Sequence, residues 1–138
     1  MTNEILALRT LAALDLTTLG EDDTATQVAA LCARARTPHG AVAAVCVYPE
    51  HIVASRAQLE VGGSPKVRVA TVTNFPDGTA DAERAVRETR RAVAAGAHEV
   101  DVVFPWRALL AGDENIGARI VAGCRDAMPA GTALKVIL

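Results

Sequence analysis

The most restrictive feature of the sequence is an alternation of apolar, β-branched runs with longer amphipathic segments. Candidate strands begin near residues 43, 67, 99 and 133, so the intervals between them are 24, 32 and 34 residues. Such intervals fit a strand, a crossover helix and the return to a parallel strand. The pattern therefore predicts an α/β chain with a parallel sheet.

Turn and cap residues set the expected element boundaries. Asn3 and Asp81 are the expected N-caps of the first and fourth long helices. The expected helices span residues 4–13, 25–36, 50–61, 82–95 and 114–127, with a short helical turn ending at residue 111. The expected strands span residues 14–19, 42–48, 67–74, 99–104 and 133–138. No Gly-x-Gly-x-x-Gly or Gly-Lys-Ser/Thr phosphate loop occurs, which favours a (β/α) barrel.

Composition narrows the function classes. The net charge is -2 and both signs are interspersed, which argues against nucleic-acid and membrane partners. No apolar run reaches the length of a membrane helix and no basic signal sequence opens the chain, so we expect a cytoplasmic protein. The histidines lack ligand spacing, which predicts no metal. Three widely spaced cysteines in apolar segments predict reduced core thiols: Cys32, Cys46 and Cys124.

An acidic residue interrupts the apolar strand predicted at residues 99–104. Alternation along a strand places Glu99, Asp101 and Val103 on one face and directs the residues between them toward helices. A buried carboxylate needs a cation, hydrogen-bond donors or a proton. Asp101 is therefore a candidate acid or base, and a satisfied structural carboxylate is the alternative.

Further polar residues fall toward the carboxyl ends of the predicted strands. A lysine desolvated near a carboxylate can act as a nucleophile or base, so Lys135 is a second catalytic candidate. The alternatives for Lys135 are an ion pair with Asp101 or a side chain that extends to solvent. For Cys46 a buried, inert thiol is the expected interpretation. The interior candidates besides Asp101 and Lys135 are Asp15, Thr17, Cys46 and Asn74.

Five blocks of the sequence together resemble a known enzyme family. They are residues 15–19 (DLTTL), 44–49 (AVCVYP), 70–76 (ATVTNFP), 99–105 (EVDVVFP) and 134–137 (LKVI). In order and spacing they resemble deoxyribose-phosphate aldolase. The resemblance implies a TIM-barrel class I aldolase, which cleaves 2-deoxy-D-ribose 5-phosphate to acetaldehyde and D-glyceraldehyde 3-phosphate through a lysine Schiff base, without metal or cofactor.

The same resemblance implies roles for individual residues. Asp101 occupies the position of an aspartate that shuttles the proton separating enamine from imine, which suits a carboxylate held in a dry site beside a cation. Asp15, Thr17, Cys46 and Lys135 match supporting positions that line the barrel.

The resemblance covers about five of the eight strands of the barrel. The family's Schiff-base Lys-Thr-Ser/Thr motif, and its second lysine with a glycine-rich phosphate loop, have no counterpart in the sequence. We therefore expect a single domain over residues 1–138, the N-terminal portion of the barrel, with little or no activity alone. One hypothesis is an aldolase remnant in which Lys135 forms the imine. The alternatives are a non-catalytic, self-associating barrel fragment or scaffold and a generic phosphosugar-binding protein.

An incomplete barrel also predicts association. The sheet edge at residues 133–138 and the apolar face of an open barrel invite contact with another chain. We expect a homo-oligomer in which strands of one copy complete another, as in a domain- or strand-swapped dimer. The expected small-molecule partner is a phosphosugar or aldehyde substrate.

Overall fold

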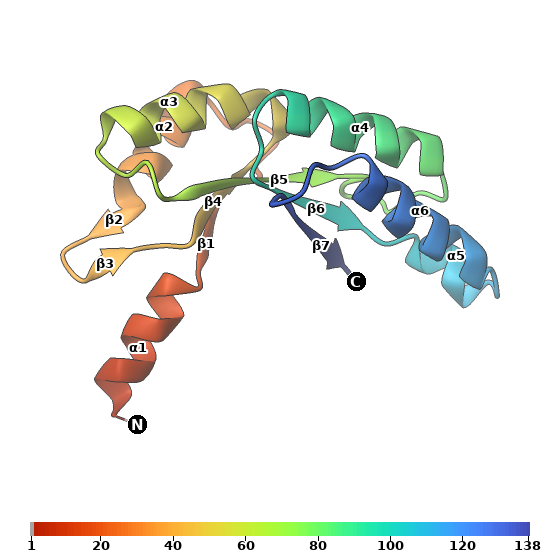
Figure 1. The fold of residues 1–138 in the computed structure, drawn as a ribbon, viewed down its shortest axis with the longest axis horizontal. Coiled ribbons are helices and arrows are strands. Elements are labelled where there is room, and N and C mark those ends of the chain that lie inside the picture. Colours follow the sequence, from red (N-terminus) through yellow and green to blue (C-terminus); the bar gives the residue numbers. More distant parts are fainter. Residues whose placement is uncertain (1) are drawn as a thin grey trace. The chain divides into compact units, whose positions relative to one another are not determined.

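A computed structural model describes residues 2–138 of the chain, in which parallel strands alternate with helices (Figure 1). The main strands are β1 (Asp15–Thr17), β4 (Ala44–Val47), β5 (Arg68–Thr73), β6 (Glu99–Val103) and β7 (Ala133–Ile137). They follow the order β1-β4-β5-β6-β7 in one sheet. This arrangement confirms the predicted α/β class with parallel strands.

The helices lie close to their predicted positions. They are α1 (Asn3–Ala12), α2 (Ala25–Arg34), the 3-10 turn η1 (Pro49–His51), α3 (Ile52–Val61), α4 (Ala82–Ala94), α5 (Trp106–Leu110) and α6 (Glu114–Asp126). Asp81 caps α4 as predicted by accepting a hydrogen bond from Arg84 N. The cap predicted at Asn3 is wrong, because the Thr2 hydroxyl accepts the bond from Ile5 N and Asn3 is already helical. No helix within residues 2–138 has the length and apolarity needed to cross a bilayer.

The chain divides into two compact units, and the boundary falls inside β5, after Ala70. The single domain expected from the sequence stays a prediction. The first unit contains α1 to α3 and the β1–β4 pair, and the second contains α4 to α6 and the β6–β7 pair.

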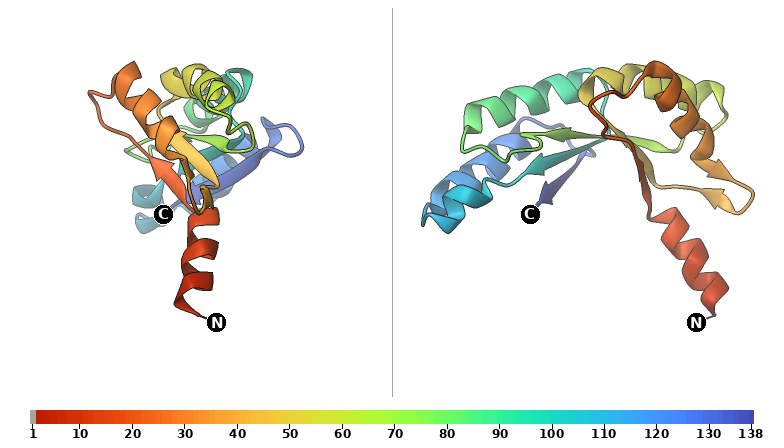
Figure 2. Two further views of the ribbon diagram at one scale, coloured as in Figure 1. Left: turned by 90° about the vertical axis from the view of Figure 1, so that its left-hand side faces the viewer. Right: turned by 180° about the vertical axis from the view of Figure 1, so that it is seen from behind.

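The first unit buries an aliphatic core between β4 and two helices. All four residues of β4 are buried, and Val28 of α2 and Ile52 of α3 are almost fully enclosed. A capping box between Thr24 and Gln27 fixes the start of α2. Helix α1 contributes no buried residue and extends away from the β1–β4 pair of its unit (Figure 2).

A short antiparallel hairpin follows α2 and was not expected from the sequence. It pairs β2 (Arg36–Thr37) with β3 (Gly40–Ala41) around Pro38 and His39. The Pro-His-Gly sequence correctly marks the end of the preceding helix. Each strand of the hairpin has only two residues, too few for period-2 alternation to be visible. The Thr37 hydroxyl donates to Gly40 O at 2.9 Å and closes this turn.

The second unit packs its helices against one face of the β6–β7 pair. Val102 of β6 is fully buried in a cluster with Ile116, Ile120 and Cys124 of α6, and Leu134 of β7 packs against it. The residues that alternate with Asp101 therefore face helices, as the sequence predicts. Figures 1 and 2 show α4 and α6 lying next to each other over this face.

The three cysteines are buried thiols, as predicted. Burial raises the pKa of the Cys124 thiol, which also accepts a hydrogen bond from Thr89 Oγ1 at 3.3 Å. Burial likewise raises the pKa of Cys32. The thiols of Cys32 and Cys124 therefore remain protonated core groups.

One close contact fixes how α6 lies on β6. The Phe104 ring, just after β6, occupies the space that a side chain at Gly117 would need. We predict that Gly117→Ala lowers the free energy of unfolding by about 1–3 kcal/mol, although alanine favours helix formation. Urea denaturation measures the change.

A double mutant identifies the cause of that loss. Combining Gly117→Ala with Phe104→Leu should cost less than the sum of the two single changes, because the shorter side chain leaves room for the methyl group. Additive losses, or a more stable Gly117→Ala variant, would contradict the packing argument.

Candidate active site

The register of β6 and β7 brings the two catalytic candidates together. The strands are parallel, and Asp101 is the direct neighbour of Lys135. Because Val102 and Leu134 face the helices, Asp101 and Lys135 project from the opposite face of this strand pair. Asp101 and Lys135 are 34 positions apart in the sequence, yet their side chains are in contact.

Lys135 lies between two carboxylates. Its Nζ is 3.0 Å from Glu99 Oε2 and 3.2 Å from Asp101 Oδ1. The Glu99 and Asp101 side chains are only 11% and 14% exposed, whereas the Lys135 side chain is 41% exposed. The lysine therefore supplies a cation beside two nearly buried acids on one strand face.

This geometry suits proton handling. The Asp101 side chain is largely shielded from bulk water, and it lies beside a lysine whose side chain is partly exposed. A carboxylate in such a position can accept or return a proton at a nearby carbon centre. The ion pair considered for Lys135 is present, and a catalytic role for either residue stays a prediction.

Glu99 is the residue of this cluster that sequence reasoning did not select. Its place on the same strand face as Asp101 was predicted, and that shared face was the available signal. Glu99 as a whole residue is 8% exposed, and it makes the shorter of the two contacts with Lys135. Any role of Lys135 therefore depends on both acids.

Asn74 is fully buried, and its side-chain amide makes hydrogen bonds with other residues of the protein. Its Nδ2 donates to Thr79 O at 2.9 Å and to Val103 O at 3.0 Å, and its Oδ1 accepts from the Thr79 hydroxyl at 2.8 Å. The backbone of Asn74 has a φ of 53°, in the left-handed region that asparagine tolerates. These bonds fasten the loop after β5 to the end of β6, and substrate lining by Asn74 stays a prediction.

Helix α4 stabilises the same loop. Glu88 Oε2 accepts from Asn74 N at 2.6 Å, and Glu88 Oε1 accepts from Arg84 Nε at 2.7 Å. This hydrogen bond and the charge of Glu88 raise the pKa of Arg84. The carboxylate thus ties the helix to the carboxyl end of β5.

Asp15, Thr17 and Cys46 belong to the first unit. The β1–β4 pairing makes Thr17 the direct neighbour of Cys46, and the Thr17 hydroxyl donates to Asp15 O at 3.0 Å. Cys46 is only 3% exposed, while Asp15 is half-buried and Thr17 is exposed. The structure thus groups these three residues on adjacent strands, and their substrate-lining role stays a prediction.

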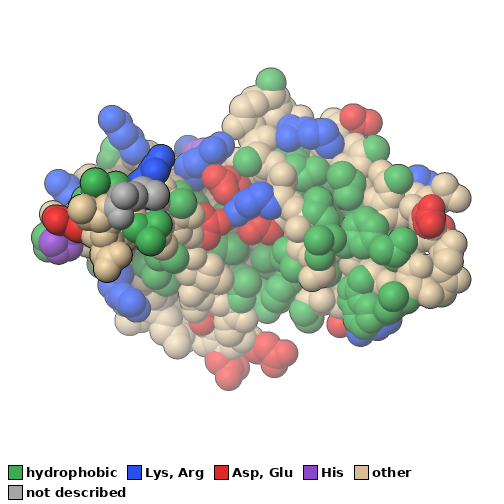
Figure 3. Space-filling model, turned by 90° about the horizontal axis from the view of Figure 1, so that it is seen from below, with side chains coloured by type: hydrophobic (Ala, Val, Ile, Leu, Met, Phe, Trp, Pro, Cys, Tyr) green, Lys and Arg blue, Asp and Glu red, His purple; other side chains and the backbone are tan. Residues whose placement is uncertain are grey.

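The face seen in Figure 3 carries apolar and charged side chains. Apolar groups gather over its right-hand part, and acidic and basic groups lie together near its centre. Exposed apolar residues of the second unit include Trp106, Leu110 and Val136.

Within residues 2–138 no group of three His, Cys, Asp or Glu side chains is arranged to hold a metal ion.

A model of the family described as DeoC/LacD family aldolase matches residues 9–137. The chain belongs to the DeoC/LacD aldolase family. This match confirms the resemblance inferred from the five sequence blocks, and it spans all the sequence-predicted site residues.

Solved structures support the same assignment. A protein assigned as a deoxyribose-phosphate aldolase from Coccidioides immitis is 31% identical with a TM-score of 0.83, over 95% of this chain and 49% of that one. The deoxyribose phosphate aldolase from Aeropyrum pernix, described as tetrameric, is 26% identical with a TM-score of 0.72, over 100% of this chain and 59% of that one. A Toxoplasma gondii protein with the same assignment is 23% identical with a TM-score of 0.83, over 100% and 53%, and supports the fold alone.

The DeoC/LacD chain described here spans about half the length of these solved structures. Its strands and helices match the corresponding part of an aldolase barrel, which confirms the predicted partial barrel.

The hydrogen bonds of Asn74 generate a stability prediction. Asn74→Gly keeps a residue that accepts the positive φ but removes the amide, so we expect a loss of about 2–3 kcal/mol in the free energy of unfolding. Asn74→Ala should lose about 1 kcal/mol more, because alanine is strained in this conformation. Urea denaturation measures both.

The matched control is Thr79→Val, which removes one hydroxyl and should cost about 1 kcal/mol. If Asn74→Gly is no less stable than Thr79→Val, the amide does not hold the loop.

Proposed function

We propose that this chain carries the proton-transfer part of a class I aldolase site that acts on a short aldehyde or a deoxyribose phosphate. One observation carries the proposal: Asp101, nearly buried on the strand face opposite the helices, lies 3.2 Å from Lys135. The family assignment supports carbon–carbon bond chemistry, and the relatives named above carry the deoxyribose-phosphate aldolase assignment.

Asp101 would move the proton that the reaction requires. In a class I aldolase a lysine imine accepts electrons from the breaking carbon–carbon bond, which leaves an enamine. Protonation of the enamine carbon then regenerates an imine that water hydrolyses. A carboxylate held in a site of low water content can deliver that proton directly or through one water.

Lys135 would position Asp101. An imine-forming lysine must present an unprotonated amine to the substrate carbonyl. The Lys135 Nζ instead lies within ion-pair distance of two carboxylates, which favour its charged form. The geometry therefore favours an electrostatic role for Lys135 over an imine-forming role, and the trapping experiment below separates the two.

The first experiment measures catalysis. We expect Asp101→Asn to lower the rate of 2-deoxy-D-ribose 5-phosphate cleavage by about 100-fold or more, since proton transfer by a placed side chain contributes about that much. Asp126→Asn, at an exposed acid at the end of α6, should leave the rate unchanged.

The assay is run with the chain by itself and with a polypeptide that carries the remaining strands of a family barrel. Activity that is insensitive to Asp101→Asn would contradict the proposal. Absence of activity in both conditions would favour the alternative, a non-catalytic scaffold.

The role of Lys135 can be tested by trapping. The printed sequence contains two lysines, Lys66 and Lys135, so borohydride reduction with acetaldehyde followed by mass mapping has few possible sites. We expect Lys135 to be labelled no more than Lys66. Selective labelling of Lys135, lost in Lys135→Arg but kept in Lys66→Arg, would instead make it the imine-forming residue.

We also propose that the chain forms a homo-oligomer. Within the described residues, β7 stands at the end of the strand order β1-β4-β5-β6-β7, and Val136 of this strand is 37% exposed. An apolar edge is a ready template for pairing with another chain. The tetramer described for the Aeropyrum pernix enzyme supports association within the family.

Sedimentation velocity tests the oligomer at micromolar concentration. We expect a dimer or larger species that Val136→Lys dissociates, because a lysine on an edge strand opposes pairing. Val61→Lys, at an apolar residue that is 88% exposed at the end of α3, is the matched control and should leave the assembly intact. A monomer, or equal effects of the two changes, would contradict association through β7.

A further inference from the structure

Helices α4 and α6 border an open groove that the proposed aldol chemistry does not use. The groove has a volume of about 580 Å³, within the range of sites for small ligands. Both helices pack on the side of the β6–β7 pair opposite Glu99, Asp101 and Lys135. The groove is therefore separate from the candidate active site.

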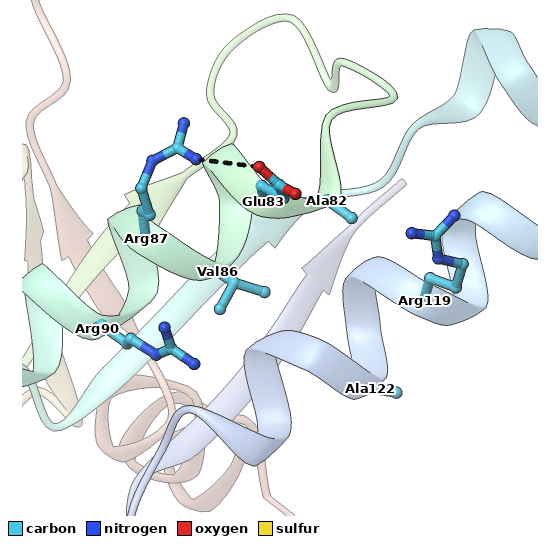
Figure 4. A pocket seen from close by; sticks show the side chains of 7 residues that line it. All are labelled: Ala82, Glu83, Val86, Arg87, Arg90, Arg119 and Ala122. Atoms are coloured by element: carbon cyan, nitrogen blue, oxygen red, sulfur yellow. Dashed lines mark ion pairs between the residues drawn. The ribbon is translucent and has the colours of Figure 1, made fainter.

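Three arginines line this groove. Arg87 and Arg90 come from α4 and Arg119 comes from α6, and Figure 4 shows Arg87 directed toward Glu83. On α4 the lining residues recur at helical spacing, so that positions 83, 87 and 90 follow one face. The only acid in the lining is Glu83, which leaves an excess of two positive charges.

The positive charges are poorly neutralised within the protein. Glu83 lies 3.8 Å from Arg87, and both side chains are more than half exposed, so this pair is weak. Arg90 and Arg119 make no ion pair or hydrogen bond with any residue in the described range 2–138. Two guanidinium groups thus border the groove with their donors available.

Apolar side chains lie between the arginines. Val86 points into the space between the helices, and Ala82 and Ala122 complete the apolar part of the lining (Figure 4). A bare anion would use the arginines but leave this surface exposed. A ligand with an apolar ring body and an attached anionic group would use both.

We propose that the α4–α6 groove binds a phosphorylated small molecule with a flat apolar body, the chemistry of a nucleotide. Guanidinium groups form paired hydrogen bonds with phosphate oxygens, and three of them line this groove from two helices. The ring would lie on Val86 and the two alanines. The site needs no residue of the Asp101–Lys135 pair, so its test stands apart from that of the aldolase proposal.

The experiment titrates the chain with ATP by calorimetry and compares tripolyphosphate and adenosine as probes. We expect one ATP to bind per chain, tripolyphosphate to bind more weakly and adenosine not to bind measurably. Arg90→Ala and Arg119→Ala should each weaken ATP binding by about tenfold, the effect of losing a charged hydrogen-bond donor.

Neighbouring positions provide matched controls. Arg91→Ala removes the same charge from an exposed position of α4 outside the groove and should change the affinity less than about twofold. Ala122→Glu puts a carboxylate into the groove and should abolish binding, whereas Ala118→Glu, exposed on α6 outside it, should not. Thermal unfolding of each variant confirms that it is folded.

Four outcomes would overturn the proposal. The first is no ATP binding at millimolar concentration, and the second is an equal loss in Arg91→Ala and Arg90→Ala, which would indicate general charge attraction. The third is tripolyphosphate binding as tightly as ATP, which would identify an adventitious anion only. An acidic peptide that binds more tightly than ATP would likewise assign the groove to a protein partner instead.

Discussion

The parallel pairing of β6 with β7 is the constraint on which the candidate site depends. Its register makes Asp101 the neighbour of Lys135, and strand alternation puts Glu99 on the same face. A shift of one residue in β7 would turn Lys135 toward the helices and replace it with an apolar side chain. Both nearly buried carboxylates would then lose their contacts with Lys135. The packing of Leu134 against the α6 cluster opposes this shift, so the hydrophobic core fixes the electrostatic pair.

Much of the fold follows from the sequence because apolar periodicity and turn residues agree along most of the chain. The strand at residues 99–104 was recognisable from its β-branched residues, and Asp81 marked the start of α4. The β2–β3 hairpin was not recognisable, because two-residue strands have no periodicity and depend on the turn at Pro38 and His39. The cap at Thr2 shows why the first residue of a helix is hard to predict from sequence. Thr2 and Asn3 are both good capping residues, so the sequence does not decide between them.

The sequence predicts the candidate site in part, and there is a physical reason why it does not predict the rest. An acid or a lysine in an apolar strand is visible in the sequence, so Asp101 and Lys135 could be selected. Which acid contacts the lysine depends on strand register and side-chain reach, and these decide that Glu99 makes the shorter contact. Asn74 illustrates the converse: its position after a strand indicated a site, but its amide bonds depend on the fold of the loop up to Thr79.

The two faces of the β6–β7 pair in the second unit differ in their chemistry. The face that carries Asp101 and Lys135 holds the ion pairs of Lys135 with Glu99 and Asp101. The helices on the other face expose Arg90 and Arg119, which have no ion pair within residues 2–138. Core packing does not require this arrangement, because Ala85 and Ala92 already supply the buried face of α4. The apolar strip between those arginines distinguishes the groove from an ordinary solvated helix surface, and it makes ligand binding there a more specific hypothesis than charge alone would allow.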